Sequence, residues 1–410
     1  MRNLIFILLL TLTLSCQNSK NEKANRNQNN SNDLIVESFH KKMDSLYNTG
    51  MFNGYSTTIV DTTGILYNKG FGYADLEHNK KYTEHTIINI ASVSKVFIGV
   101  ALLKAQELNY LNLNDPINKH LPFEVINPNF PEEVITVKHL ATHTSAIVDT
   151  DQYMETCYVN LDNIPIEEGS KKKYELYYQN PSDDWKPLDA YLKKILVNNE
   201  EFYDASTFAK RKPGTKYEYS NIGAALCALV IESAVKKPFD KFTDQYIFKP
   251  LAMNATSWNF EEVDRSEYSK LYADDNLLPY YRILSYPDGG LITSSTDLGY
   301  FLQELIKGYS GKGNILEDDS YQELFKPQLE QKAFSEKKNK GFNVGFFLEL
   351  EADYNEIGHT GGDPGVNSFM YFNTETKTGR ILITNTDSQK ENSGEVFYGI
   401  WNTLVEYKTH

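Results

Sequence analysis

Two long apolar runs in the chain predict buried helices. Every residue between Val96 and Leu103 is apolar apart from Gly99, and polar residues between Ile222 and Val235 occur only near the end. A helix that is apolar on all sides lies inside a protein rather than on its surface. We therefore expect both helices at the centre of the core.

Runs of β-branched and aromatic residues predict strands near both ends of the chain. Tyr55–Val60 and Ile65–Gly72 flank the turn Asp61–Gly64, a pattern typical of a hairpin. Three later segments are expected to be strands: Gly341–Leu350, Asn367–Phe372 and Arg380–Asn385. Helical spacing is expected in the first and last ordered segments: Leu34–Asn48 and Gly394–Tyr407.

This order of elements predicts an α+β fold. An antiparallel sheet flanked by helices, built from both termini, would join a mainly helical middle region. Residues 149–202 are polar and weakly periodic. We expect them to form an insertion over the body of the domain at residues 34–410, and they could act as a lid.

Composition excludes one class of function. The 410 residues, 40% of them hydrophobic, suffice for a large core in one or two units. The formal net charge of −14 argues against nucleic-acid binding.

The N-terminus has the features of an export signal. Arg2 precedes the apolar run Leu4–Leu14, which is too short to span a bilayer, and Ser15 and Cys16 follow. Residues 1–16 resemble the signal peptide of a bacterial lipoprotein with Cys16 as the lipid-attachment site; an ordinary secretory signal is the alternative. Polar residues 17–33 predict a flexible tether. We expect an exported protein that contacts a membrane only through its lipid anchor.

The other two cysteines leave a disulfide open. Cys157 and Cys227 could pair in an oxidising compartment, but Cys227 lies in an apolar helix, which favours a buried thiol. His139 and His143 have i,i+4 spacing, yet the Glu of H-E-x-x-H is absent, which favours capping or packing. No metal or other cofactor is expected.

The first candidate for chemistry is Ser92, three residues before Lys95. S-x-x-K occurs five times in the chain, so the pattern alone is weak, and a helix cap is the alternative. Only this copy leads into a long apolar helix. If the helix begins near Ala91, Ser92 and Lys95 share its first turn. Burial would then favour a neutral Lys95 that can accept a proton from the serine.

Two further segments could complete the site. Tyr219 could move protons and Asn221 could bind Lys95 or a substrate amide. We expect the cation of Lys95 to favour the anionic form of the Tyr219 phenol. His359, Thr360, Gly361 and Gly362 precede a strand, and the glycines would let a substrate backbone pair along its edge. A glycine-rich hairpin loop is the alternative.

The motif order S-x-x-K, Y-x-N and H-T-G resembles the penicillin-recognising serine hydrolases, above all the class C β-lactamase, D,D-peptidase and esterase branch. The resemblance covers about residues 34–407. It implies that Ser92 is the acylated nucleophile, that Lys95 and Tyr219 transfer protons, and that Asn221 anchors the substrate. It also implies an oxyanion hole made by the backbone N–H groups of Ser92 and Gly362.

The sequence departs from this family pattern at two positions. His359 replaces the lysine of K-T-G, and Ala146 replaces a common glycine, so efficient β-lactam hydrolysis is not expected. The resemblance implies hydrolysis of an amide or ester in a small molecule or peptide, with D-amino-acid peptides as one class. The alternative is a non-catalytic receptor of penicillin-binding type that keeps the fold.

Overall fold

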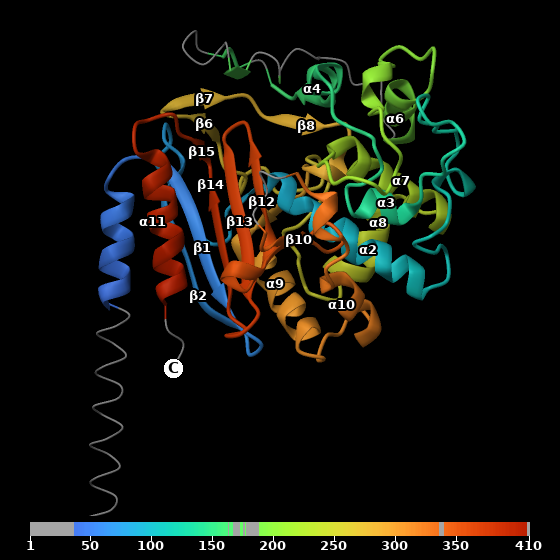
Figure 1. The fold of residues 1–410 in the computed structure, drawn as a ribbon. Coiled ribbons are helices and arrows are strands. Elements are labelled where there is room, and N and C mark those ends of the chain that lie inside the picture. Colours follow the sequence, from blue (N-terminus) through green and yellow to red (C-terminus); the bar gives the residue numbers. More distant parts are fainter. Residues whose placement is uncertain are drawn as a thin grey trace, which may run out of the picture. The chain divides into compact units, whose positions relative to one another are not determined.

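The centre of the fold is an antiparallel sheet of eight strands (Figure 1). This computed structural model describes residues 37–162, 164–166, 173–174, 177, 188–335 and 340–407. The predicted signal peptide at residues 1–16, Cys16 and the tether at residues 17–33 lie outside the described residues. The fold is α+β, as the sequence predicts.

The sheet joins strands from both ends of the sequence. Its order is β10-β11-β12-β13-β14-β1-β2-β3. In the pair that joins the N-terminal strands to the C-terminal strands, Tyr55 of β1 lies opposite Thr384 of β14. The strand bounds are β1 Gly54–Val60, β2 Ile65–Asp75, β3 Lys80–Lys81, β10 Phe342–Val344, β11 Glu349–Glu351, β12 Glu356–Asp363, β13 Val366–Asn373 and β14 Gly379–Thr384.

One predicted strand is wrong. Residues 341–350 form two short strands, β10 and β11, instead of one. Phe347 has a φ of 54°, and the N–H of Gly345 donates to the carbonyl of Leu348 at 2.9 Å. This backbone turn reverses the chain and makes the two strands an antiparallel pair.

Helices form the rest of the core. Helix α2, the predicted apolar helix at residues 96–103, packs against α7, and α9 packs against β1 and β14. Phe97 of α2 stacks on Phe301 of α9 with ring centroids 3.8 Å apart. The helix bounds are α2 Lys95–Glu107, α3 Val137–Ala141, α4 Asp151–Cys157, α6 Leu188–Leu196, α7 Asn221–Val235, α8 Phe239–Thr243, α9 Ser295–Tyr309 and α10 Asp318–Phe325.

Short strands fix the loops around α2. The N–H of Ile90 donates to the carbonyl of Leu291 at 2.9 Å, directly beyond the β4–β9 pair. The short strands are β4 Ile87–Asn89, β5 Tyr158–Asn160, β6 Leu271–Ala273, β7 Asn276–Leu278, β8 Tyr281–Ile283, β9 Ile292–Ser294 and β15 Thr386–Asp387.

The described part of residues 149–202 contributes to the core. Tyr153, Cys157 and Tyr191 are buried there, and β5 pairs with β8. Whether any of this segment moves as a lid stays a prediction. Cys157 and Cys227 are both buried free thiols, so they do not pair with each other.

Two terminal helices belong to a separate compact unit, which the structure describes at residues 37–50 and 394–407. The first covers residues 37–47 and the second is α11 (Ser393–Glu406). Lys42 and Glu406 form an ion pair at 2.6 Å, and the rings of Phe39 and Tyr407 meet edge to face at 4.9 Å. Within the described ranges, no helix has the length and apolar character needed to cross a membrane.

Candidate active site

Ser92 and Lys95 lie at the start of the central helix, as predicted. A 3-10 helix, η1 (Ala91–Ser94), holds Ser92, and α2 begins at Lys95. The Lys95 ammonium donates to the Ser92 hydroxyl at 3.0 Å and to the Asp288 carbonyl. The Lys95 side chain is fully buried, whereas Ser92 is partly exposed. A reachable hydroxyl therefore touches a desolvated amine.

The backbone around Ser92 is tightly constrained. Ala91 has a φ of 46°, which is unfavourable for a residue with a side chain. Gly361 on β12 lies against this backbone, because a Cβ there would lie 2.6 Å from the Ile90 carbonyl oxygen and 3.0 Å from the Ser92 nitrogen. The Ser368 hydroxyl donates to the same Ile90 carbonyl at 2.7 Å. Glycine is thus required where the sheet meets the turn that carries Ser92.

Burial gives Lys95 the character of a base. Desolvation lowers the pKa of its amine, and the nearby carboxylates of Asp288, Asp149 and Asp363 partly oppose this shift. The net direction is downward, which raises the fraction of neutral amine at neutral pH. The structure thus supports the predicted environment of Lys95.

Tyr219 joins this pair from a distant part of the sequence. The Lys95 nitrogen lies 5.0 Å from the centroid of the Tyr219 ring. The His143 ring stacks on the same Tyr219 ring, with the two centroids 4.6 Å apart. The Tyr219 hydroxyl is buried and interacts with the Ser92 hydroxyl, but it has no hydrogen bond of ordinary geometry to any residue that the structure describes. The three predicted proton-transfer side chains therefore meet.

The expected charge state of Tyr219 is wrong. Burial raises the pKa of its phenol well above the usual value; the Ser92 hydroxyl lowers it in part, while Asp288 raises it further. The nearby lysine does not overcome desolvation, so the phenol is protonated at neutral pH. Tyr219 is placed to donate a proton, and Lys95 is the better base.

Asn221 lies at the first position of α7. Its backbone N–H donates to Asp149 at 2.9 Å, and the Ile222 N–H donates to the same carboxylate at 3.0 Å. Ser220 caps the helix. The Asn221 side chain makes no hydrogen bond to Lys95, whose partners are Ser92 and Asp288. Sequence reasoning missed Asp149; a carboxylate at this helix N-terminus is stabilised by free N–H groups.

The segment from His359 to Gly362 forms a strand edge beside Ser92. Strand β11 pairs only with Glu356, Ile357 and Gly358 of β12, and the remaining residues of β12 pair only with β13. One edge of residues 359–363 is therefore without a neighbouring strand in the described sheet, and Gly362 is exposed there. The edge is suited to pairing with an extended backbone.

His359 does not supply a positive charge. It is 3% exposed, its Nδ1 donates to the Thr360 carbonyl, and burial lowers its pKa. Its ring centroid lies 6.0 Å from that of Tyr219. The His359 ring is neutral at neutral pH and lies beside the Tyr219 phenol.

The two other histidines have structural partners. His139 completes a capping box with Thr136 at the start of α3. His143 follows the end of that helix, has a φ of 54° and accepts the Ser220 N–H on Nδ1 at 3.2 Å. The two are therefore not on one helix face, and their roles are capping and packing.

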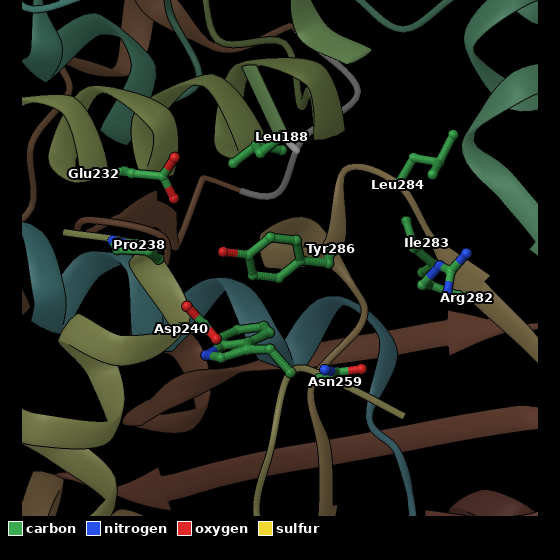
Figure 2. Close-up of a pocket in the computed structure, with 10 residues that line it drawn as sticks. Leu188, Glu232, Pro238, Asp240, Asn259, Arg282, Ile283, Leu284 and Tyr286 are labelled. Atoms are coloured by element: carbon green, nitrogen blue, oxygen red, sulfur yellow. The ribbon is translucent and has the colours of Figure 1, made fainter. Parts of the chain in front are cut away.

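A cavity of about 280 Å³ lies on the far side of the turn that contacts Lys95 (Figure 2). Trp258, Tyr286 and Leu284 contribute its apolar lining, and the carboxylate of Glu232 faces it. Its lining includes none of the predicted site residues. Tyr286 begins the 3-10 helix η6 (Tyr286–Asp288), whose last carbonyl accepts from Lys95. Among the described residues, this turn links the cavity to the Ser92–Lys95 pair.

Comparison with known proteins gives a family match. Residues 39–402 match the family model described as Beta-lactamase. Protein flp of Staphylococcus aureus (strain NCTC 8325 / PS 47) is 25% identical over 347 residues, which are 83% of this chain and 61% of that protein. The chain thus spans about 61% of the length of this relative.

Solved structures show the same fold. The octameric penicillin-binding protein homologue from Pyrococcus abyssi superposes with a TM-score of 0.71 at 21% identity, covering 90% of this chain and 77% of that one. The D-amino acid amidase from Ochrobactrum anthropi SV3 gives a TM-score of 0.65 at 19% identity, covering 90% and 98%.

Proposed function

The chain belongs to the beta-lactamase family, and we propose that it is a serine hydrolase that forms an acyl-enzyme on Ser92. The observation that carries the proposal is the contact between a partly exposed serine hydroxyl and a fully buried lysine amine at 3.0 Å. The bond that it hydrolyses would be an amide or ester.

The geometry supports a two-step reaction. Neutral Lys95 accepts the proton of Ser92 as the serine oxygen attacks the substrate carbonyl. The backbone N–H groups of Ser92 and Gly362 would stabilise the oxyanion. The leaving group then takes a proton from Tyr219, whose raised pKa keeps the phenol protonated. A water molecule attacks the ester on Ser92, and the same groups return the protons.

The proposed substrates are peptides, including peptides with D-amino acids, and small esters. An extended substrate would pair with the free edge of β12, and Asn221 would contact its amide. Because His359 is neutral, we do not propose efficient hydrolysis of β-lactams, whose carboxylate would lack a cation at this position. The fold shared with a D-amino acid amidase supports an amide substrate.

The proposal is tested by covalent labelling. A fluorophosphonate probe should add one equivalent to the intact protein, and peptide mapping should place the adduct on Ser92. Unlabelled protein would refute the proposed function. Labelling together with acylation that never turns over on a panel of esters and D-amino-acid amides would favour the alternative, a penicillin-binding-type receptor.

Replacing Tyr219 by phenylalanine should separate activity from stability. The lost hydroxyl has no hydrogen bond of ordinary geometry to the described residues, so the free energy of unfolding should change by less than about 1 kcal/mol. Loss of a positioned proton donor should lower turnover about 10²- to 10⁴-fold. Denaturant titration and ester hydrolysis measure the two effects. Tyr217→Phe, two residues away, is the control and should retain activity; equal rates in both variants would contradict the role of Tyr219.

We also propose that the chain is exported and anchored to a bacterial membrane through lipid on Cys16. The run Leu4–Leu14 before Ser15 and Cys16 supports this proposal. The full-length protein should fractionate with membranes and carry a lipid mass on Cys16. Cys16→Ser should abolish both properties, and identical fractionation of the two proteins would contradict the anchor.

A further inference from the structure

Two tyrosine–aspartate hydrogen bonds border the catalytic centre. The Tyr153 hydroxyl donates to Asp288 at 2.6 Å, and the Tyr158 hydroxyl donates to Asp363 Oδ1 at 2.6 Å. Tyr153 lies on α4 and Tyr158 on β5. The two pairs therefore join residues 149–202 to the walls of the site.

Both aspartates lie next to the reacting groups. The backbone carbonyl of Asp288 accepts from Lys95, and Asp363 directly follows Gly362 at the end of β12. A Cβ on Gly289 would lie 3.4 Å from Asp363 Oδ2 and 3.8 Å from the carbonyl carbon of Ala91, so Oδ2 is near the turn that holds Ser92. Asp363 is partly exposed, and its Oδ2 makes no hydrogen bond within the described part of the chain. One carboxylate oxygen thus has no hydrogen-bond partner among the described residues.

The charges around Ser92 favour a cation. Asp149, Asp288 and Asp363 all act on the single buried amine of Lys95. Burial lowers the pKa of both His143 and His359, so neither histidine balances the carboxylates at neutral pH.

We propose that Asp363, positioned by Tyr158 and backed by Asp288, makes this site select acyl groups that carry an ammonium beside the scissile carbonyl. The substrate class would be amides and esters of amino acids or peptides with a free α-amino group. The Asp363 Oδ2 atom would accept from the ammonium while Ser92 attacks the adjacent carbonyl. This inference rests on the proposed function and names the substrates of the same site.

Titration of Asp363 gives the preference a pH dependence. Burial raises the pKa of Asp363 to about 7; the Tyr158 hydrogen bond and Lys95 lower it, and Asp288 raises it. Asp363 also interacts electrostatically with the Tyr177 phenol and the Cys157 thiol, and it raises the pKa of both. Protonation of Asp363 removes its negative charge, so the preference for ammonium should disappear as the pH falls below about 7. It should also fade above about pH 8, where the α-amino group of the substrate loses its own charge.

Matched phosphonate probes test the inference without knowledge of the natural substrate. Diphenyl 1-aminoethylphosphonate, as each enantiomer, would be compared with its N-acetyl derivative, and intact mass would give the labelling rates of Ser92. In wild-type protein at about pH 7.5, between the pKa of Asp363 and that of an α-amino group, the free amine should react about 10- to 100-fold faster, the range expected for a hydrogen bond to a charged group. Asp363→Asn should reduce this ratio to near 1 at every pH.

Two further variants keep the test decisive. Tyr158→Phe should weaken the preference at about pH 7.5, because loss of the hydroxyl raises the pKa of Asp363 and leaves less of its carboxyl group charged. Glu304→Gln is the control: this carboxylate also accepts a tyrosine hydroxyl, that of Tyr321 at 2.6 Å, but lies on α9. Its probe ratio should equal that of the wild type.

The outcomes separate the two proposals. If neither these probes nor a fluorophosphonate labels Ser92, the proposed function is wrong. If Ser92 is labelled but wild type reacts equally with both probes, or Asp363→Asn and Tyr158→Phe leave the ratio unchanged, the inference is overturned while the hydrolase proposal stands.

Discussion

Substitution of Ser92 by alanine should abolish covalent labelling and reduce hydrolysis by at least about 10⁴-fold. Removal of the attacking oxygen leaves only binding and oxyanion stabilisation, which give a small residual rate. The fold should survive, because Ser92 is partly exposed and its described side-chain hydrogen bond is to Lys95. Intact mass after probe treatment and steady-state ester hydrolysis measure the effect.

Ser233→Ala is the matched control for this prediction. Ser233 also stands three residues before a lysine, Lys236, but it lies near the end of α7. This variant should label and turn over like the wild type. Equal labelling of Ser92→Ala and wild-type protein would exclude Ser92 as the nucleophile.

Substitution of Lys95 by methionine should lower the acylation rate about 10²- to 10⁴-fold, the usual contribution of a general base. Methionine retains most of the buried stem and removes an amine that burial disfavours, but it leaves the Asp288 carbonyl without its donor. These effects oppose each other, so the free energy of unfolding should change by no more than about 2 kcal/mol. Stopped-flow acylation and thermal denaturation measure the two quantities.

Lys104→Met provides a comparison on the same helix. Lys104 forms an ion pair with Glu107 at 2.6 Å near the end of α2. Its loss should affect stability alone. A Lys95→Met variant that acylates at the rate of Lys104→Met would show that another group removes the proton from Ser92.

Residue patterns predicted the larger elements because those elements bury continuous apolar surface. The all-apolar faces of α2 and α7 and the hairpin β1–β2 follow from local sequence. The strand expected at residues 341–350 failed because Phe347 adopts a positive φ, which no local pattern marks. The short pairs β4–β9 and β5–β8 depend on partners more than 100 residues away and have no sequence period of their own.

Local sequence also suffices to identify the candidate reacting side chains, but it does not predict their protonation states. Ser92, Lys95 and Tyr219 meet as predicted, whereas the protonated state of Tyr219 depends on complete burial by distant segments. The hydrogen-bond partners of Asp288 and Asp363 come from α4 and β5. The two carboxyl groups therefore come together beside Ser92 only once the chain is folded. Asp149 had a physical signal in the free N–H groups at the start of α7, which sequence reasoning did not use.

The position in the sequence of the two tyrosines that bind Asp288 and Asp363 has an evolutionary consequence. Tyr153 and Tyr158 belong to a segment that supplies none of Ser92, Lys95 and Tyr219. Mutations there can change the polarity around Asp288 and Asp363 while Ser92, Lys95 and Tyr219 stay in place. Sequence changes in α4 and β5 would let the substrate specificity evolve step by step, without an inactive intermediate.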